Sequence, residues 1–372
     1  MTVSSTDRLE PATIHRGAVP TTPAYRFDPL NDSRWEDFLQ RHPRASLFHS
    51  SAWLSALRET HGYEAIAYTT SRPGNALENA IVFCKVESWL TGRRLVSIPF
   101  ADHAQPLVDS EDHAMAIGAT LEGDLEREGW DYLEIRPLLL FSAMGALHQK
   151  TVTYSYHLLD LNPGLNKLFE NLHKSSIQRK IRRAEREGLA YREGSSQEFL
   201  DQFYRLFLLT RRRHNLPPQP KVWFANLMNS FEKALKIRLA YKDDRPVAAI
   251  MTIVYKDAIS YKYGASDARF NHLGGVPLLL WKTIEDAKSM GARFLDFGRT
   301  NADQPSLMTF KNRWGASQSV LMYSRYSDSQ CATHFFDSSE TNWKSNWAKY
   351  ILSHLPQSLV SKTGEMFYRH AG

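Results

Sequence analysis

Apolar and polar positions follow a regular period from about residue 25 onward, and the period changes repeatedly between helical and strand-like spacing. In the segment 50–61, Trp53, Leu54 and Leu57 fall on one face, which is typical of an amphipathic helix. The same spacing predicts helices over residues 35–42, 115–128, 163–188, 198–214 and 276–290. Residues 1–24 are rich in Thr, Pro and Ser without either period, so we expect a loose leader there.

Short apolar runs bounded by turn residues predict the strands. They cover residues 79–87, 94–99, 131–136, 237–241, 247–255, 258–263 and 294–297. Helices and strands alternate in both halves of the sequence, which is the order of an α/β protein.

Two segments of the chain match each other in kind at nearly every position. The run Gly129–Ile135 (GWDYLEI) corresponds to Gly291–Phe297 (GARFLDF). Each run follows an amphipathic helix, begins at the glycine that ends this helix, and carries an acid, Glu134 or Asp296, in mid-strand. The shared order of elements indicates that the chain contains two copies of one α/β unit.

The chain is expected to have four parts. They are a flexible leader at 1–24, a first domain at 25–158, a second domain carrying the site at 159–330, and a helical tail at 331–372. Two domains also agree with the length of the chain, because 372 residues are too many for one compact core. The tail carries aromatic and aliphatic residues at helical spacing, which suits a helix docked on the body or one on a membrane surface. Its few basic residues favour the docked helix.

Charge and cysteine content narrow the class of protein. The formal net charge of +6 favours an anionic partner, and nucleic acid, phosphorylated sugar, coenzyme and membrane surface all meet this condition. Cys84 and Cys331 have no CxxC or Cys/His spacing, so neither a disulfide framework nor a cysteine-based metal site is expected. The sequence shows no secretory signal and no apolar run of bilayer length, so we expect a cytoplasmic protein.

A glycine pair marks one candidate binding site. Gly274 and Gly275 separate the strand that contains Tyr263 from the next helix, and Pro277 falls in the first turn of that helix. Free backbone N–H groups at such a helix start suit a phosphate or a carboxylate. The alternative, which the sequence favours equally, is that the glycines only form a tight strand-to-helix connection and bind no ligand.

A second candidate lies in the polar segment after the strand 294–297. Lys311 follows an aromatic residue and stands between two arginines in the sequence. A lysine held in this way can stabilise an oxyanion or a phosphate. The alternatives are a solvated Lys311 over the face of Trp314, and an Asp296 that serves as a buried partner of Arg299 rather than as a base.

The helix predicted over 176–188 has a strongly basic face. Its arginines at i, i+3, i+4 and i+7 are Arg179, Arg182, Arg183 and Arg186. One interpretation is a polyanion contact, such as a tRNA backbone or a diphosphate. The other is a solvated charged face, which is the more common role of such a run.

The sequence shows none of the common motifs of covalent catalysis or of metal catalysis. The sequence has no HExxH, Walker or nucleophile-elbow pattern and no evident Ser/His/Asp set. What remains is direct attack by an amine or hydroxyl on a bound ester or thioester, for which positioning and oxyanion support can suffice.

Several of these features occur together in one family. They are the basic helix 179–188, the run from Tyr263-Gly-Ala-Ser to Phe294-Leu-Asp-Phe-Gly-Arg-Thr, and Phe310-Lys311 ahead of Trp314-Gly315. The combination resembles the Fem-type (FemA/FemB/FemX-like) peptidyltransferases of the peptidoglycan bridge and their relatives associated with exopolysaccharide or exosortase gene clusters. The resemblance covers about residues 45–325.

This resemblance implies two tandem GNAT-like (Gcn5-related acetyltransferase) domains, each a mixed, mostly antiparallel sheet flanked by helices. It also implies transfer of an aminoacyl or acyl group to an amine of a cell-envelope precursor. Phe310 and Lys311 would then be the catalytic residues, with the lysine stabilising the developing charge. We expect the substrates to be bound by Tyr261, Tyr263, Gly274, Gly275, Arg299, Asn301, Arg313 and Trp314.

The acyl donor stays open between aminoacyl-tRNA and acyl-CoA, and we expect neither a permanently bound cofactor nor a metal. The sequence shows no heptad insertion like the coiled-coil arm that Fem proteins often carry for tRNA, and Arg269–Val276 matches the acetyl-CoA loop only loosely. Alternative functions are acetyl-CoA-dependent N-acetylation of a sugar or small molecule, and non-catalytic polyanion binding. Expected partners are the envelope precursor, tRNA and the inner membrane surface, but not DNA.

Overall fold

One twelve-stranded sheet runs through both halves of the protein. The computed structural model describes residues 22–89, 91–139, 141, 143, 145, 147–328, 368 and 370. Within them the strand order is β1-β2-β3-β4-β5-β12-β6-β11-β10-β9-β8-β7. All neighbouring strands are antiparallel except the pairs β4–β5 and β10–β11.

The strands fall into three groups along the sheet. The first half supplies β1 (Tyr25–Phe27), β2 (Glu64–Thr69), β3 (Ile81–Ser88), β4 (Gly92–Val96) and β5 (Tyr132–Ile135). The second half supplies β7 (Ala190–Gly194), β8 (Leu235–Lys242), β9 (Arg245–Tyr255), β10 (Ala258–Ser266) and β11 (Phe294–Thr300). Between them lie β6 (His148–Asp160) and β12 (Ser317–Ser327).

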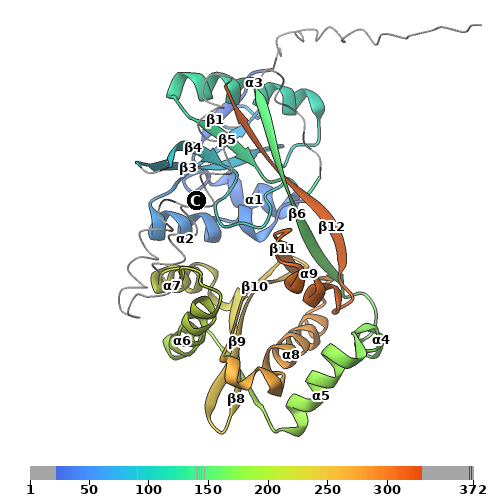
Figure 1. The fold of residues 1–372 in the computed structure, drawn as a ribbon. Coiled ribbons are helices and arrows are strands. Elements are labelled where there is room, and N and C mark those ends of the chain that lie inside the picture. The colour runs from blue at the N-terminus through green and yellow to red at the C-terminus, as the bar shows by residue number, and fades with distance from the viewer. Residues whose placement is uncertain are drawn as a thin grey trace, which may run out of the picture.

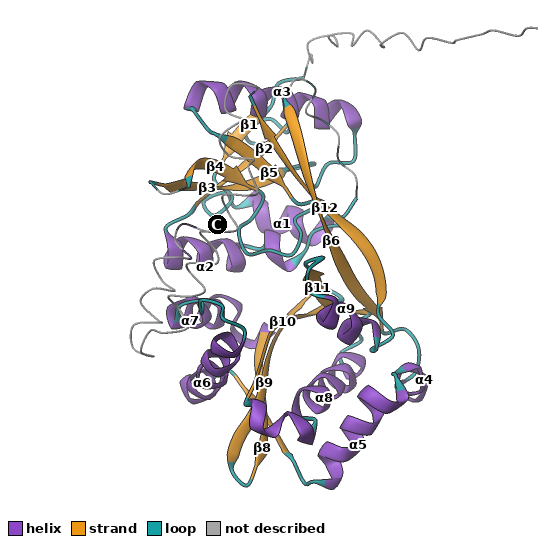
Figure 2. Ribbon diagram, viewed as in Figure 1, coloured by secondary structure: helices purple, strands orange, loops and turns teal. Residues whose placement is uncertain are grey.

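Helices cover both faces of the sheet in each half (Figure 2). The first half carries α1 (Arg34–Arg41), α2 (Ser51–His61) and α3 (Glu111–Glu128). The second half carries α4 (Leu165–Asn171), α5 (Arg179–Arg186), α6 (Gln197–Arg213), α7 (Lys221–Phe231), α8 (Gly275–Ser289) and α9 (Pro305–Asn312). Among the described residues, no helix combines the length and apolarity needed to cross a bilayer.

Successive strand residues point to opposite faces, so each sheet half builds two cores. In β3, Val82 packs toward α1 and α2, whereas Phe83 packs toward α3. In β9, Met251 packs toward α6 and α7, and Ile250 packs toward α5 and α8. The predicted class, an α/β protein with a mostly antiparallel sheet flanked by helices, is therefore confirmed.

The two halves contact each other through α2 and α7. The rings of Trp53 and Trp223 meet edge to face at 5.3 Å between centroids, and both side chains are completely buried. The core that they share continues from α1 through α2 into α6 and α7. The halves are thus joined by apolar packing as well as by the sheet.

Strands β6 and β12 form a long antiparallel ribbon between the halves (Figure 1). At one end β12 pairs with β5 of the first half, where Arg325 stands opposite Glu134. On its other edge β6 pairs with β11 of the second half. The expected domain boundary between residues 158 and 159 falls inside β6.

The single helix expected over residues 163–188 is wrong, because the chain forms three pieces. These are α4, a π-helical turn at Lys174–Gln178, and α5. Leu172 is extended at the break, and the His173 side chain caps the π-helical turn by accepting from the Ser176 amide. The Gln178 side chain donates to the carbonyls of Phe169 and Leu172, which satisfies the end of α4.

Other expected elements agree with the structure to within a few residues, but five strands were not predicted: β1, β2, β6, β7 and β12. The expected leader lies outside the described residues for positions 1–21. The expected helical tail also lies outside them, apart from Tyr368 and His370.

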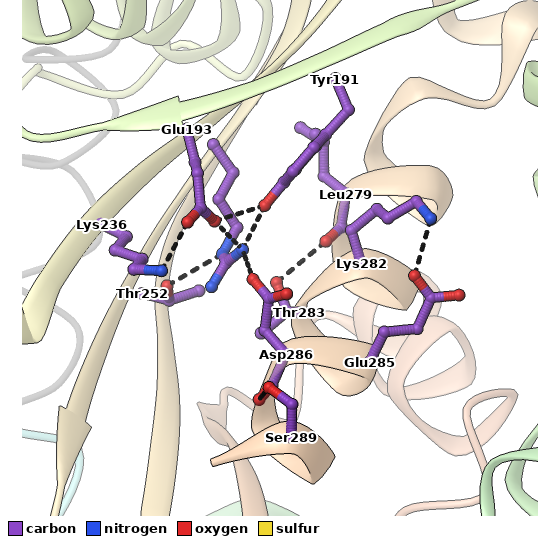
Figure 3. A network of polar contacts seen from close by, with 11 residues as sticks. Tyr191, Glu193, Lys236, Thr252, Leu279, Lys282, Thr283, Glu285, Asp286 and Ser289 are labelled. Carbon is purple, nitrogen blue, oxygen red and sulfur yellow. Dashed lines mark hydrogen bonds and ion pairs between the residues drawn. The ribbon is translucent and has the colours of Figure 1, made fainter.

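A buried arginine ties α8 to the sheet edge of the second half (Figure 3). Arg238 of β8 is completely buried, and one of its amino groups contacts Tyr191 and Glu193 of β7 and Asp286 of α8. Lys236 pairs with the same Glu193. Since a buried cation requires opposite charges around it, this network fixes the position of α8 on β7 and β8.

Candidate active site

The two parallel strand pairs occupy equivalent positions in the two halves. Val96 of β4 stands opposite Glu134 of β5, and Ser260 of β10 stands opposite Asp296 of β11. Both acids are buried, with 2% and 6% of their surface exposed. The two acids that suggested a duplication therefore share one register, which supports two copies of one unit.

In the second half, both strands of the parallel pair are irregular where the pairing stops. The register of β10 against β9 shifts between Tyr261 and Tyr263. The register of β11 against β6 shifts between Asp296 and Gly298. Parallel pairing between β10 and β11 covers three residue pairs, although both strands run on beyond it. Bulges re-aim side chains and end pairing, so a wedge opens between the two strands here.

An ion pair between the two halves lies at this wedge. Lys262, at the irregular position of β10, contacts Asp102 of the first half at 2.6 Å. The Lys262 ammonium also lies 4.6 Å from the centroid of Phe48 and 5.3 Å from that of Trp53. Burial acts to raise the pKa of Asp102, but the charge and hydrogen bond of Lys262 outweigh it and lower that pKa below its usual value. Asp102 therefore stays ionised.

Lys311 of α9 lies against the same stretch of β11. Its side chain is 3% exposed, and its Nζ donates to the carbonyls of Gly298 and Arg299, both at 2.9 Å. Burial lowers the pKa of Lys311 to about 8, while the charges of Asp102 and Asp296 oppose this shift. An ammonium has three N–H groups, so one remains for a further acceptor. Lys311 is thus a buried cation near neutral pH with donor capacity to spare.

Aromatic rings and an arginine lie beside this lysine. The guanidinium of Arg299 stacks on Tyr154 at 4.4 Å and on Tyr323 at 5.2 Å. Asp296 faces His103 at 3.5 Å. Burial, and then the charge and hydrogen bond of Asp296, raise the pKa of Tyr156 well above its ordinary value. These groups come from both halves and from the ribbon between them.

The equivalent place in the first half is filled. Arg136 lies two residues after Glu134, just as Gly298 lies two residues after Asp296. Glu134 binds Arg136 at 2.7 Å and Arg325 at 2.6 Å, and Arg136 donates to the Ile98 carbonyl at 2.9 Å. Burial acts to raise the pKa of Glu134, but the two arginines outweigh it and lower the value to about 2. An internal ion cluster therefore occupies the first copy, whereas the second copy keeps a glycine and a lysine.

A cavity of about 470 Å³ between the halves reaches this polar group. Its apolar lining includes Leu47, Phe48 and Leu158. Its polar lining includes His103 and Asp296. A ligand in this cavity would lie one layer of side chains from the Asp102–Lys262 pair, because Phe48 lines the cavity and also underlies Lys262.

Of the expected site residues, Lys311 and Arg299 come together at the wedge. Asn301 and Arg313 are exposed, with the Asn301 amide oxygen 3.4 Å from Arg299. Phe310 is half-buried and packs edge to face on Trp314, which is completely buried in the core under α8. The roles of these residues stay predictions.

The two expected tyrosines leave β10 toward different cores. Tyr261 packs against Phe297 on the α8 side. Tyr263 packs with α6 and α7, where its hydroxyl accepts from the indole of Trp223 at 2.8 Å. They frame Lys262, which lies between them in sequence.

The glycine pair at the start of α8 serves close packing. Gly274 has a positive φ of 83°, and a Cβ there would stand 2.4 Å from the Lys180 carbonyl of α5. A Cβ on Gly275 would stand 2.8 Å from Ala248 of β9. Both glycines are buried, so this helix start is not open to solvent.

The four arginines of the basic helix lie largely at the surface. Arg179, Arg182 and Arg186 are exposed. Arg182 stacks on Phe169 at 5.3 Å, and the half-buried Arg183 lies 3.6 Å from Glu187. The exposed members leave a basic surface on α5.

Sequence reasoning missed Asp102 and Lys262. Asp102 lies in an irregular loop, and 160 positions separate it from its partner, so no local pattern could have paired them. Lys262 gave a signal that could have been used, because it is the only charged residue in β10 and lies between two tyrosines. Among the described residues, no group of three or more His, Cys, Asp and Glu side chains could hold a metal ion.

Comparison with known proteins finds a family match within the second half of the chain. Residues 172–312 match the family described as Acetyltransferase (GNAT) domain. This range contains β10, β11, α9 and Lys311. No curated protein matches the chain in sequence.

Solved structures share the fold at low sequence identity. FemX superposes with a TM-score of 0.62 at 13% identity, covering 80% of this chain and 96% of its own. The C-terminal domain of a putative lysylphosphatidylglycerol synthetase from Agrobacterium fabrum gives 0.53 at 13% identity, covering 82% of this chain and 94% of that one. A tandem GNAT protein from the clavulanic acid biosynthesis pathway gives 0.51 at 12% identity, covering 82% and 98%.

Proposed function

We propose that this protein is an acyltransferase that transfers an aminoacyl group to an amine of a cell-envelope precursor, in keeping with the match of residues 172–312 to the GNAT acetyltransferase family. The reaction would take place at the wedge between β10 and β11. Both the peptidoglycan and the exopolysaccharide precursors are candidate acceptors. The likeness to FemX supports the fold, and the proposed substrates follow from the Fem-type features of the sequence.

The observation that carries the proposal is the placement of Lys311. A buried ammonium is held by two carbonyls at the point where β10 and β11 separate, with one N–H to spare. When an amine attacks an ester carbonyl, negative charge develops on the carbonyl oxygen. A fixed cation in a water-poor site stabilises that charge more than it stabilises the neutral ester.

The remaining steps need only the groups of the two substrates and the site. The amine nitrogen bonds to the carbonyl carbon, the C–O bond to the leaving hydroxyl breaks, and one proton passes from nitrogen to that oxygen. Asp102 and Lys262 keep the wedge polar, and the cavity lined by Asp296 and His103 lies beside it as a candidate site for the acceptor. No covalent intermediate with the protein is required.

The start of α8 favours an aminoacyl ester over acyl-CoA as the donor. A coenzyme diphosphate would suit an open helix start. Here Gly274 and Gly275 are buried, and the Lys180 carbonyl of α5 lies against Gly274. The basic surface of α5 is a candidate contact for the tRNA part of the donor. Acetyl-CoA-dependent N-acetylation remains the alternative that the assay below separates.

The test is a labelled-donor assay with a mixture of aminoacyl-tRNAs and, in parallel, acetyl-CoA, on amine-bearing envelope precursors. We expect transfer from aminoacyl-tRNA, and a loss of about a hundredfold in kcat for Lys311→Met. Lys288→Met is the matched control, because Lys288 also donates to two carbonyls, of Leu161 and Asn162, outside the wedge. No transfer from either donor, or full activity of Lys311→Met, would contradict the proposal.

A further inference from the structure

Tyr368 lies at the contact between the two halves. Tyr368 is 8% exposed, and its carbonyl accepts from the Tyr63 hydroxyl of the first half at 3.0 Å. Its own hydroxyl accepts from Arg211 at 2.7 Å and donates to the Pro217 carbonyl at 3.2 Å, both in the second half. Tyr368 therefore binds both halves at once.

The ring of Tyr368 packs on one loop of the first half. It meets the ring of Phe100 at 5.7 Å between centroids and an angle of 64°. Phe100 also contacts His61 at 5.1 Å and Trp223 at 5.9 Å. Tyr368 thus completes an aromatic cluster that spans the two halves.

The loop under this ring is strained and carries Asp102. Ile98 and Phe100 have positive φ values of 61° and 59°, which non-glycine residues rarely adopt. Such a conformation is unfavourable by itself and persists only where surrounding contacts impose it. Asp102 follows Phe100 by two positions, and its pairing with Lys262 requires the loop to keep this shape.

We infer that Tyr368 is a positioning residue for the candidate site: by packing between the halves it holds the loop 97–103, and thereby Asp102, against Lys262 and Gly298. Its ring packs edge to face against Phe100. Its hydroxyl fixes the ring to Arg211 and Pro217. The catalytic consequence rests on the proposed transfer reaction, but the structural one does not.

His370 supplies a matched control at the same end of the chain. Its ring forms a hydrogen bond with the Ser88 hydroxyl at 2.9 Å. Its carbonyl accepts hydrogen bonds from the side chains of Thr91 and Arg94, both at 2.9 Å. These partners all lie on the β3–β4 hairpin of the first half. His370→Ala therefore removes a side-chain contact with the first half without touching Phe100.

The experiment measures hydrogen exchange of the full-length protein by mass spectrometry, together with kcat and KM. Ala101 and Ala104 report on the loop, because their amides donate to the carbonyls of Ile98 and Arg136. We expect Tyr368→Ala to speed exchange in the segment 97–104 by about tenfold while β9 exchanges as before. Tyr368→Phe, which keeps the ring on Phe100, should restore most of the protection, and His370→Ala should change little.

Three results would overturn the inference. They are unchanged exchange of 97–104 in Tyr368→Ala, an equal increase in every segment, and a Tyr368→Phe variant as loose as Tyr368→Ala. In the transfer assay, kcat of Tyr368→Ala should fall while KM stays near its original value. If the unmodified protein transfers from neither donor, the proposed function fails, whereas the exchange result still decides the positioning role.

Discussion

Asp102 of the first half lies directly against Gly298 of the second. A Cβ at position 298 would stand 2.7 Å from the Asp102 carboxylate, and Gly298 has a positive φ of 68°. The site therefore depends on a glycine in one half and a carboxylate in the other.

Gly298→Ala should combine backbone strain with displacement of Asp102. Gly291→Ala is the control, because Gly291 has a similar φ of 74° but a Cβ there would meet no atom within 4 Å. We expect Gly291→Ala to lower the free energy of unfolding by about 1–2 kcal/mol, and Gly298→Ala to lower it by about 1–3 kcal/mol more. Urea unfolding measures both values, and equal losses would show that the Asp102 contact is without effect.

The pH dependence of transfer should follow Lys311. Its pKa is lowered to about 8, so its charge is present below that pH and lost above it. If the ammonium stabilises the developing oxyanion, kcat should decline as pH rises through about 8. Lys311→Arg should remove this decline, because arginine keeps its proton. A wild-type profile that stays level up to about pH 10, well above this pKa, would exclude an ammonium role.

Glu134→Gln should destabilise the protein by about 3–5 kcal/mol, because Arg136 would lose its buried counter-ion. The exposed Glu87, which pairs with Arg93 at 3.2 Å, is the control, and Glu87→Gln should cost less than about 1 kcal/mol. The pKa of Glu134 is lowered from 4.5 to about 2. Its stabilisation is therefore present above pH 4.5 and lost as pH falls toward 2. Urea unfolding from neutral pH down to about pH 2 measures both effects, and a small loss at neutral pH would contradict the buried-pair account.

Neutralising the basic surface of α5 should weaken tRNA binding. The test variant changes Arg179, Arg182 and Arg186 to Gln, and the control changes three exposed first-half arginines, Arg41, Arg72 and Arg127. We expect the α5 variant alone to bind labelled tRNA more weakly, with a salt slope reduced by about two to three. Filter binding at several salt concentrations measures the slope. If the two variants bind tRNA with equal salt slopes, the arginines of α5 only face solvent and do not contact tRNA.

The sequence was informative where a local period or a short polar motif carried the structure. The helix near 276–290 and the strand at 294–297 were predicted because their apolar spacing is clear, and Lys311 stood out beside its aromatic neighbours. The register of Glu134 and Asp296 was implied by the matching runs. These features depend on residues close together in the chain.

Features that depend on distant residues could not be predicted in this way. Half of β6 is polar and exposed, so its partner β12 rather than its own pattern makes it a strand. The break before α5 depends on Gln178 reaching back to the carbonyls of α4. The Asp102–Lys262 pair forms only when the two halves have come together.

The crossing of β12 from the second half back to β5 has a consequence for biosynthesis. The sheet of the first half acquires its sixth strand only from residues 317–327, which also place Tyr326 in the core under α3. The ribosome makes these residues after nearly everything else in the described chain. The first half must therefore wait with an unpaired β5 edge until the second half has emerged, and the two halves reach their final state together.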